Sequence, residues 1–190
     1  MELKEEFYPN GSIKLQRWWL NGEIHRDDGP ASIGYRPNGS ISAKEWYLNG
    51  ERHREDLPAY IVYYRILDEN CSTKSYGLIK YQSWWLNDKR HRDNGPSIIG
   101  YLPCGSIEYQ EWWLSGKRHN SNGPSSIIYG ENGSIFHQYF HLNGSRLKEK
   151  EFIKYKKEIE NSYTVLLLQS NFTLYNGFEK WLIPEIVKLI

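Results

Sequence analysis

The residues best suited to chemistry in this sequence are histidine–arginine pairs that recur at regular intervals. They are His25-Arg26, His53-Arg54 and His91-Arg92, with His119-Asn120 as a fourth copy. Guanidinium groups donate paired hydrogen bonds to carboxylates and phosphates, so a row of such pairs could bind anionic groups. Acidic residues follow the pairs directly and could instead neutralise the arginines within the same loop. These are Asp27, Asp28, Glu55, Asp56 and Asp93.

A second repeated feature is an aromatic residue six positions before each histidine. This aromatic row consists of Trp19, Tyr47, Trp85 and Trp113. Two residues earlier, on the same face of a predicted strand, stand Arg17, Glu45, Ser83 and Glu111. An aromatic row among polar side chains is typical of a partly exposed surface that could stack on a peptide or a nucleobase. The alternative is that cross-strand aromatic pairs hold the sheet together.

The tryptophan that precedes each member of the aromatic row has a different environment. Trp18, Trp46, Trp84 and Trp112 are each followed two residues later by a leucine. An apolar residue at every second position predicts one buried strand face, so we expect these tryptophans to pack in the core.

Neither a metal centre nor a catalytic centre is expected. The histidines occur once per repeat, and adjacent rungs of a sheet would spread them beyond the reach of one ion. The sequence contains no Cys-x-x-Cys, His-Glu-x-x-His or phosphate-loop pattern. The candidate serine nucleophiles all belong to one repeated turn, whereas an enzyme needs an asymmetric site. They are Ser12, Ser40, Ser106 and Ser134. We therefore expect a non-enzymatic protein without a cofactor.

The spacing of these residues reveals the elements that must position them. Leucines recur at Leu20, Leu48, Leu86, Leu114 and Leu142, at intervals of 28, 38, 28 and 28 residues. Alternation of apolar residues from Ile13 to Leu20 predicts a strand. Pro-Asn-Gly and Asn-Gly sequences predict tight hairpin turns with positive φ at both central positions. The sequence thus predicts an all-β repeat array, in which stacked antiparallel β-hairpins form an elongated twisted sheet with a C-terminal helical cap.

The repeats are expected to span residues 7–147 as five hairpin units, with a ten-residue insertion near 64–76. Beyond Gly144 the pattern stops, and the charged stretch 146–160 predicts a helix. Residues 164–168 could extend that helix or form a strand, and Pro184–Ile190 predicts a short helix. Residues 148–190 are interpreted as a mainly helical cap over the last hydrophobic face. The strand at Ile13–Leu20 lacks a neighbour unless residues 1–6 supply one, and an open edge would allow a homodimer.

Composition limits the classes of partner. The 190 residues include 24 basic and 23 acidic side chains, a net charge of +1, which predicts no attraction to nucleic acid or to an acidic membrane. No apolar run reaches the ~18 residues of a membrane span, and the N-terminus lacks the apolar core of a signal peptide. Two cysteines, Cys71 and Cys104, make no disulfide framework. We expect a cytoplasmic protein, or one of the host cytoplasm if it is viral.

The repeat resembles the MORN (membrane occupation and recognition nexus) repeat, a hairpin unit with a tryptophan, a turn glycine and a following His-Gly. Trp19, Gly22 and His25 show this spacing. Tyr47-Gly50-His53 and Trp113-Gly116-His119 keep it, and Asp88 replaces the glycine between Trp85 and His91. The units are longer than in that family, and Arg26, Arg54 and Arg92 stand where it has glycine. The Asp-Gly-Pro continuation resembles a variant subclass found in viral and bacterial proteins.

The resemblance covers about residues 7–147 and implies an elongated sheet of stacked hairpins. It also implies contact with proteins or, less securely, with lipids, and it does not imply a catalytic site. We therefore expect a binding scaffold for protein–protein interaction, with the aromatic row and the His-Arg edge as anchors. The alternative is a viral or bacterial protein that sequesters a phosphorylated small molecule, such as a nucleotide signal. A flat aromatic strip would favour the scaffold, and a deep pocket between cap and sheet would favour the alternative. The candidate binding residues are Trp19, Tyr47, Trp85, Trp113, His25, Arg26, His53, Arg54, His91, Arg92 and His119.

Overall fold

The computed structural model describes residues 1–65 and 78–174 of the chain. Apart from its first two residues, the insertion expected near 64–76 lies outside the described residues. The short helix expected at Pro184–Ile190 does so entirely. The two flanks of the insertion stay paired, because the backbone N–H of Tyr64 donates a hydrogen bond to the carbonyl of Leu78 at 3.0 Å.

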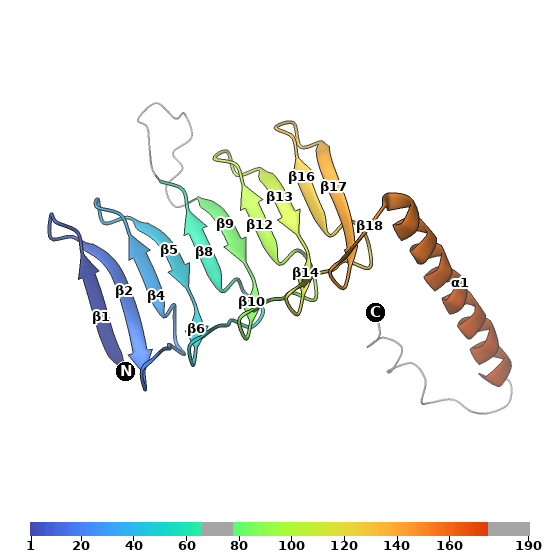
Figure 1. Cartoon of the computed structure of the whole chain (residues 1–190), viewed down its shortest axis with the longest axis horizontal. Helices are drawn as coiled ribbons and strands as arrows, with labels where there is room; N and C mark the ends of the chain where they lie inside the picture. Colours follow the sequence, from blue (N-terminus) through green and yellow to red (C-terminus); the bar gives the residue numbers. More distant parts are fainter. Residues whose placement is uncertain (66–77, 175–190) are drawn as a thin grey trace.

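A twelve-stranded antiparallel sheet runs through the repeat region, which confirms the predicted array of stacked hairpins (Figure 1). Its strands pair in chain order, with β3 attached beside β2. They are β1 (Glu2–Phe7), β2 (Ile13–Leu20), β3 (Glu23–Ile24), β4 (Ser32–Tyr35), β5 (Ile41–Glu45), β8 (Tyr60–Tyr63), β9 (Ile79–Ser83), β12 (Ile98–Tyr101), β13 (Ile107–Glu111), β16 (Ser126–Tyr129), β17 (Ile135–Leu142) and β18 (Ser145–Leu147).

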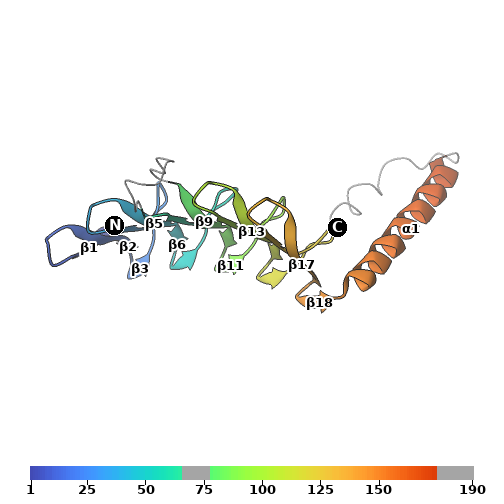
Figure 2. The same ribbon diagram turned by 90° about the horizontal axis from the view of Figure 1, so that it is seen from above.

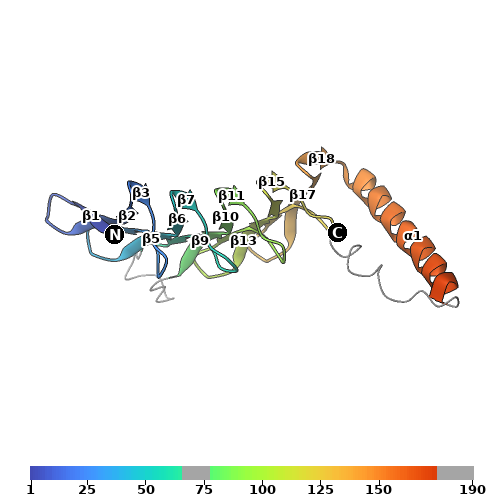
Figure 3. The ribbon, with the colours of Figure 1, turned by 90° about the horizontal axis from the view of Figure 1, so that it is seen from below.

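Short hairpins follow three of the long strands and project from one side of the sheet (Figures 2 and 3). They are β6 (Tyr47–Leu48) with β7 (Glu51–Arg52), β10 (Trp85–Leu86) with β11 (Lys89–Arg90), and β14 (Trp113–Leu114) with β15 (Lys117–Arg118). The end of β2 with β3, and the end of β17 with β18, form the equivalent turns in the first and last repeats. Each repeat thus contributes one long and one short hairpin.

The two kinds of turn differ in backbone conformation. In the Pro-Asn-Gly turn at the tip of β1 and β2, Gly11 has φ of 80° and Asn10 does not have positive φ. The pairing register slips beside this turn, between Glu6 and Phe7, as in a type I turn with a bulge. Our expectation of positive φ at both central positions is therefore wrong for these turns. It holds for the short hairpins, where Asn21 and Gly22 have φ of 52° and 85°.

The register separates two faces of the sheet. Directly paired residues point to the same side, so one row contains Arg17, Ser32, Glu45, Tyr60, Ser83, Ile98, Glu111, Ser126 and Tyr139. We call this side the aromatic face, because residues of this row bind side chains of the aromatic row, as Glu45 binds Tyr47 and Ser83 binds Trp85. The opposite side presents Gln16, Ile33, Lys44, Ile61, Gln82, Ile99, Gln110, Ile127 and Gln138. Within the described residues, α1 (Glu149–Leu174) lies beyond the last strand and over neither face, whereas the short hairpins project from one side of the sheet (Figure 2).

The best-buried positions lie where the long hairpins join the short ones. Four equivalent small residues there are fully buried, at Ala31, Ala59, Ser97 and Ser125. Each accepts a backbone hydrogen bond from the tryptophan that we expected in the core, as in Trp84 N–H to Ser97 at 2.9 Å. Trp84 is only 7% exposed, whereas Trp18, Trp46 and Trp112 are half-buried.

An additional element adjoins each end of the repeat array, β1 at the first repeat and α1 at the last. Residues 2–7 form β1 and cover β2, so the first uncovered edge belongs to an exposed strand rich in charge, including Glu2, Lys4 and Glu6. At the other end α1 (Glu149–Leu174) is one continuous helix through 164–168. Its Phe152 is 5% exposed and packs on Phe140, with ring centroids 4.8 Å apart. Beyond this contact the helix runs away from the sheet (Figure 1).

Candidate binding surface

Three members of the aromatic row alternate with arginines along the aromatic face. The side chains follow the order Tyr47, Arg52, Trp85, Arg90, Trp113 and Arg118, and we call this set the aromatic–arginine ladder. The Arg90 guanidinium carbon lies 5.2 Å from the ring centroid of Trp85 and 5.0 Å from that of Trp113. Arg52 lies 5.3 Å from Tyr47 and 4.8 Å from Trp85, so each ring and cation attract one another.

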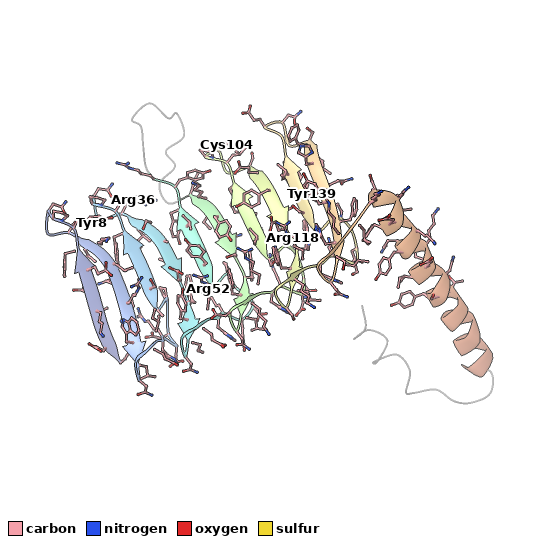
Figure 4. The ribbon with its side chains drawn as sticks, viewed as in Figure 1. Tyr8, Arg36, Arg52, Cys104, Arg118 and Tyr139 are labelled. Atoms are coloured by element: carbon pink, nitrogen blue, oxygen red, sulfur yellow. The ribbon has the colours of Figure 1, made fainter. Side chains whose placement is uncertain are left out.

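The short hairpins produce this order. In β6 and β7, Tyr47 pairs directly with Arg52, which puts ring and guanidinium on the same face of the hairpin. Backbone hydrogen bonds then join neighbouring hairpins, as in Arg54 N–H to the Trp85 carbonyl at 3.1 Å. Arg52 and Arg90 are thereby inserted between the ring of their own repeat and that of the next, and Arg118 lies against Trp113. Figure 4 shows Arg52 and Arg118 along the same margin of the sheet.

Carboxylates neutralise two of the three arginines. Glu45 forms an ion pair with Arg52 and accepts a hydrogen bond from the Tyr47 hydroxyl at 2.9 Å. Glu111 binds Arg118 at 2.8 Å. Burial, with Glu45 nearby as a lesser cause, raises the pKa of Tyr47 to about 12, so this phenol stays protonated as a donor.

The middle rung lacks this carboxylate. The position that holds Glu45 and Glu111 in the neighbouring repeats is Ser83, which is fully buried. Its hydroxyl accepts a hydrogen bond from Trp85 Nε1 at 2.7 Å. Within the described residues, no carboxylate oxygen lies within ion-pair distance of the half-buried Arg90. Arg90 is thus the one cation of the ladder whose charge the described side chains leave uncompensated.

The arginines of the His-Arg pairs contact residues of their own repeat. Arg92 lies 3.9 Å from the ring centroid of Trp84 and donates to the carbonyl of Pro96 at 3.0 Å. Arg26 and Arg54 make the equivalent contacts with Trp18 and Trp46. Of the acidic residues expected to neutralise them, Asp28 binds Arg26 at 2.7 Å. Burial lowers the pKa of Arg92, as expected for a guanidinium held against a ring.

The histidines of the pairs bind the next repeat. His25 Nδ1 accepts a hydrogen bond from the backbone N–H of Asn49 at 3.0 Å, and its Nε2 faces Asp27 at 3.1 Å. His91 and His119 accept in the same way from Ser115 and Asn143, at 3.2 and 3.1 Å. His53 Nδ1 lies 2.7 Å from the side-chain oxygen of Asn87. These imidazoles therefore hold the positive-φ turn of the following repeat.

The candidate residues therefore separate into two groups. The structure brings Tyr47, Trp85 and Trp113 together, while Trp19 lies at the start of the array with Lys4 at 5.2 Å from its ring. The His-Arg residues lie in other loops and have internal contacts. Sequence reasoning missed the ladder arginines, although each stands seven residues after the polar position at Glu45, Ser83 or Glu111. They are Arg52, Arg90 and Arg118.

Two hollows accompany these elements. One of about 400 Å³ is lined by Trp84, His91 and the paired residues Arg54 and Arg92, but also by the acidic side chains Glu55, Asp56 and Asp93. The other, of about 560 Å³, lies between β17, β18 and the start of α1, where Arg146 and Lys148 adjoin Glu149 and Glu151. Both hollows therefore have mixed charge.

Metal binding and membrane crossing each require a particular arrangement of residues in the part of the chain that the structure describes. No group of three His, Cys, Asp or Glu side chains gathers there in an arrangement that could hold a metal ion. Nor does any described helix combine the length and apolarity that crossing a membrane requires. No family model, curated protein or solved structure matches the chain.

Proposed function

We propose that this protein is a non-enzymatic, MORN-like scaffold that binds a protein partner through the aromatic–arginine ladder. The observation that carries the proposal is the half-buried ladder itself, on a part of the sheet over which α1 does not lie. Tryptophan, tyrosine and arginine are the residues that most often dominate protein interfaces, because they combine large apolar area with directed polar groups. Here they lie side by side in one strip.

Rigidity supports the same function. The ladder hairpins are fixed by hydrogen bonds to their neighbours, such as Gly116 N–H to the Arg90 carbonyl at 2.9 Å. Each guanidinium between two rings is also confined before any partner arrives. Binding to such a surface costs less conformational entropy than binding to mobile side chains.

The sequestering alternative has less electrostatic support. The hollow beside the His-Arg pairs contains two arginines that are engaged with Trp46 and Trp84. Three carboxylates line the same hollow, at Glu55, Asp56 and Asp93. A phosphate there would meet repulsion from these carboxylates, with few free donors to compensate it. The scaffold function therefore fits the arrangement of charges better.

The test is affinity capture with the full chain as bait, from cells that express it. Wild-type protein is compared with Trp113→Ala, which removes a ring of the ladder. Phe136→Ala is the matched control, because it removes an aromatic side chain that is 69% exposed elsewhere on the sheet. Proteins retained by wild type and by the control, but lost with Trp113→Ala at unchanged circular dichroism, support the proposal. Equal recovery by all three baits would refute it.

A further inference from the structure

We propose that the middle rung of the ladder binds an acidic side chain of the partner, with Arg90 as its receptor. This inference rests on the proposed scaffold function and specifies the chemistry of the partner at one position. The carboxylate of an Asp or Glu from the partner would occupy the place that the chain's own glutamates occupy in the rungs on either side. The rungs of Arg52 and Arg118, each with its own glutamate, can be compared directly with the rung of Arg90.

The neighbouring rungs show what each ladder arginine binds. At Arg118 the carboxylate of Glu111 uses one oxygen for the guanidinium at 2.8 Å and the other for Trp113 Nε1 at 2.8 Å. At Arg52, Glu45 binds the guanidinium and the Tyr47 hydroxyl together. In both rungs one carboxylate sits against a guanidinium and an aromatic donor. The surroundings of a ladder arginine are thus compatible with a bound carboxylate.

Ser83 both removes the carboxylate and occupies the aromatic donor. Its hydroxyl takes the Trp85 Nε1 hydrogen bond, so no indole donor remains unsatisfied in this rung. The guanidinium of Arg90 remains with a ring on each side and no anion among the described residues. A half-buried cation without a counter-ion has lost part of its hydration without a matching ion pair. An incoming carboxylate would supply that ion pair and two strong hydrogen bonds.

Other cations of the sheet differ from Arg90. Arg17 has Glu6 at 3.7 Å, so a counter-ion is already present. Arg146 lies over Tyr139 at 4.9 Å, but it is exposed at the end of the array, where water solvates it. Among the residues that the structure describes, only the middle rung combines a half-buried guanidinium, two flanking indoles and a missing glutamate. Charge complementarity therefore selects an acidic residue, and its position selects the centre of the ladder.

The experiment observes the arginine side chains directly. We would record ¹H–¹⁵N spectra of the arginine Nε–H groups of the full chain and assign the Arg90 signal with Arg90→Gln. The probe is glutamate blocked at both ends, N-acetyl-glutamate amide, titrated at constant ionic strength. The neutral probe N-acetyl-glutamine amide and inorganic phosphate are titrated separately. We expect a saturable shift at Arg90 with the glutamate probe, while Arg52 and Arg118 remain unshifted because they are already paired.

Three variants complete the design. Arg90→Gln should weaken binding of the glutamate probe by at least about tenfold, because the charged donors are lost. Lys89→Gln, an exposed change of the same charge in the same hairpin, should leave it within about twofold. Arg90→Lys keeps a cation without the forked donors of a guanidinium, so its affinity for the glutamate probe should lie between those of Arg90→Gln and Lys89→Gln.

Several results would overturn the inference. They are no saturable shift at Arg90, equal shifts at Arg52, Arg90 and Arg118, equal binding of the glutamine probe, or tighter binding of phosphate than of glutamate. The capture experiment separates this failure from failure of the scaffold function. Partners lost with Trp113→Ala but retained with Arg90→Gln would leave the scaffold in place and remove only the acidic contact.

Discussion

Replacing Arg92 with asparagine tests whether the His-Arg pairs are structural. The fourth repeat already contains this substitution, because Asn120 stands at the equivalent position. Asn120 still donates to the carbonyl of Pro124, at 2.8 Å, so Arg92→Asn should keep the hydrogen bond to Pro96. What it loses is the guanidinium 3.9 Å from the Trp84 ring and the cover that the long side chain gives this indole.

The expected cost follows from those losses. Trp84 is only 7% exposed, so its cation–π contact is partly desolvated and contributes about 1–2 kcal/mol. The retained hydrogen bond adds nothing to the difference. For a chain of this size, such a loss corresponds to a fall of about 2–8 °C in Tm. The assay is thermal and urea unfolding followed by tryptophan fluorescence, with Lys89→Asn as an exposed change of equal charge.

The result that would refute the reasoning is an Arg92→Asn variant as stable as Lys89→Asn, whose effect should stay within about 0.5 kcal/mol. Arg92 would then contribute nothing to the loop that it covers. The His-Arg edge would in that case return as a candidate ligand site, with Arg92 held in place for a partner. A loss within the expected range would assign the pair to folding.

Three other predictions concern the end of the array and the sheet surface. Phe152→Ala should cost about 3 kcal/mol locally, because it removes a buried ring from Phe140, and should speed hydrogen exchange in 149–164. The exposed Ile153→Ala should leave that exchange unchanged. Burial lowers the pKa of His141 from 6.5, so the folded state binds its proton less readily than the unfolded state. Stability should therefore be complete above about pH 6.5 and decline as pH falls below it, and urea unfolding of His141→Gln should show a weaker decline. Finally, a Cβ on Gly100 would lie 2.1 Å from the Tyr109 ring, so Gly100→Ala should destabilise the sheet by more than about 1 kcal/mol. In a double-mutant cycle that cost should shrink in the Tyr109→Ser background, and additive effects would contradict the contact.

Much of the fold could be predicted from the sequence because its information is repeated. Five leucines separated by four intervals, of which three are 28 residues long, together with turn sequences and alternating strands were sufficient to predict the stacked hairpins. The turn conformation at Asn10-Gly11 was not predictable in the same way, because Asn-Gly fits both a two-residue turn and a longer turn with a bulge. The choice depends on the register at Phe7, which only the paired strands determine.

The candidate binding surface was less accessible to sequence reasoning. Trp85 and Trp113 could be chosen by type and spacing, since aromatic residues among polar neighbours are recognisable. The position of Arg90 between two indole rings could not, because it depends on the contact between one short hairpin and the next. The same holds for His25, whose hydrogen-bond partner Asn49 lies 24 residues away in the chain. Contacts between repeats leave no short-range pattern.

The bond from each histidine to the following turn has a consequence for how this architecture can change length. Each repeat holds its successor through the same groups, as His91 holds Ser115 and His119 holds Asn143. A duplicated unit of about 28 residues would therefore find a matching junction on both sides. The chain can gain or lose whole units without a redesigned boundary, and each gain adds one ring and one cation to the strip. The number of copies thus sets the length of this strip, and the few positions where one copy departs from the others, such as Ser83, distinguish one rung from the next.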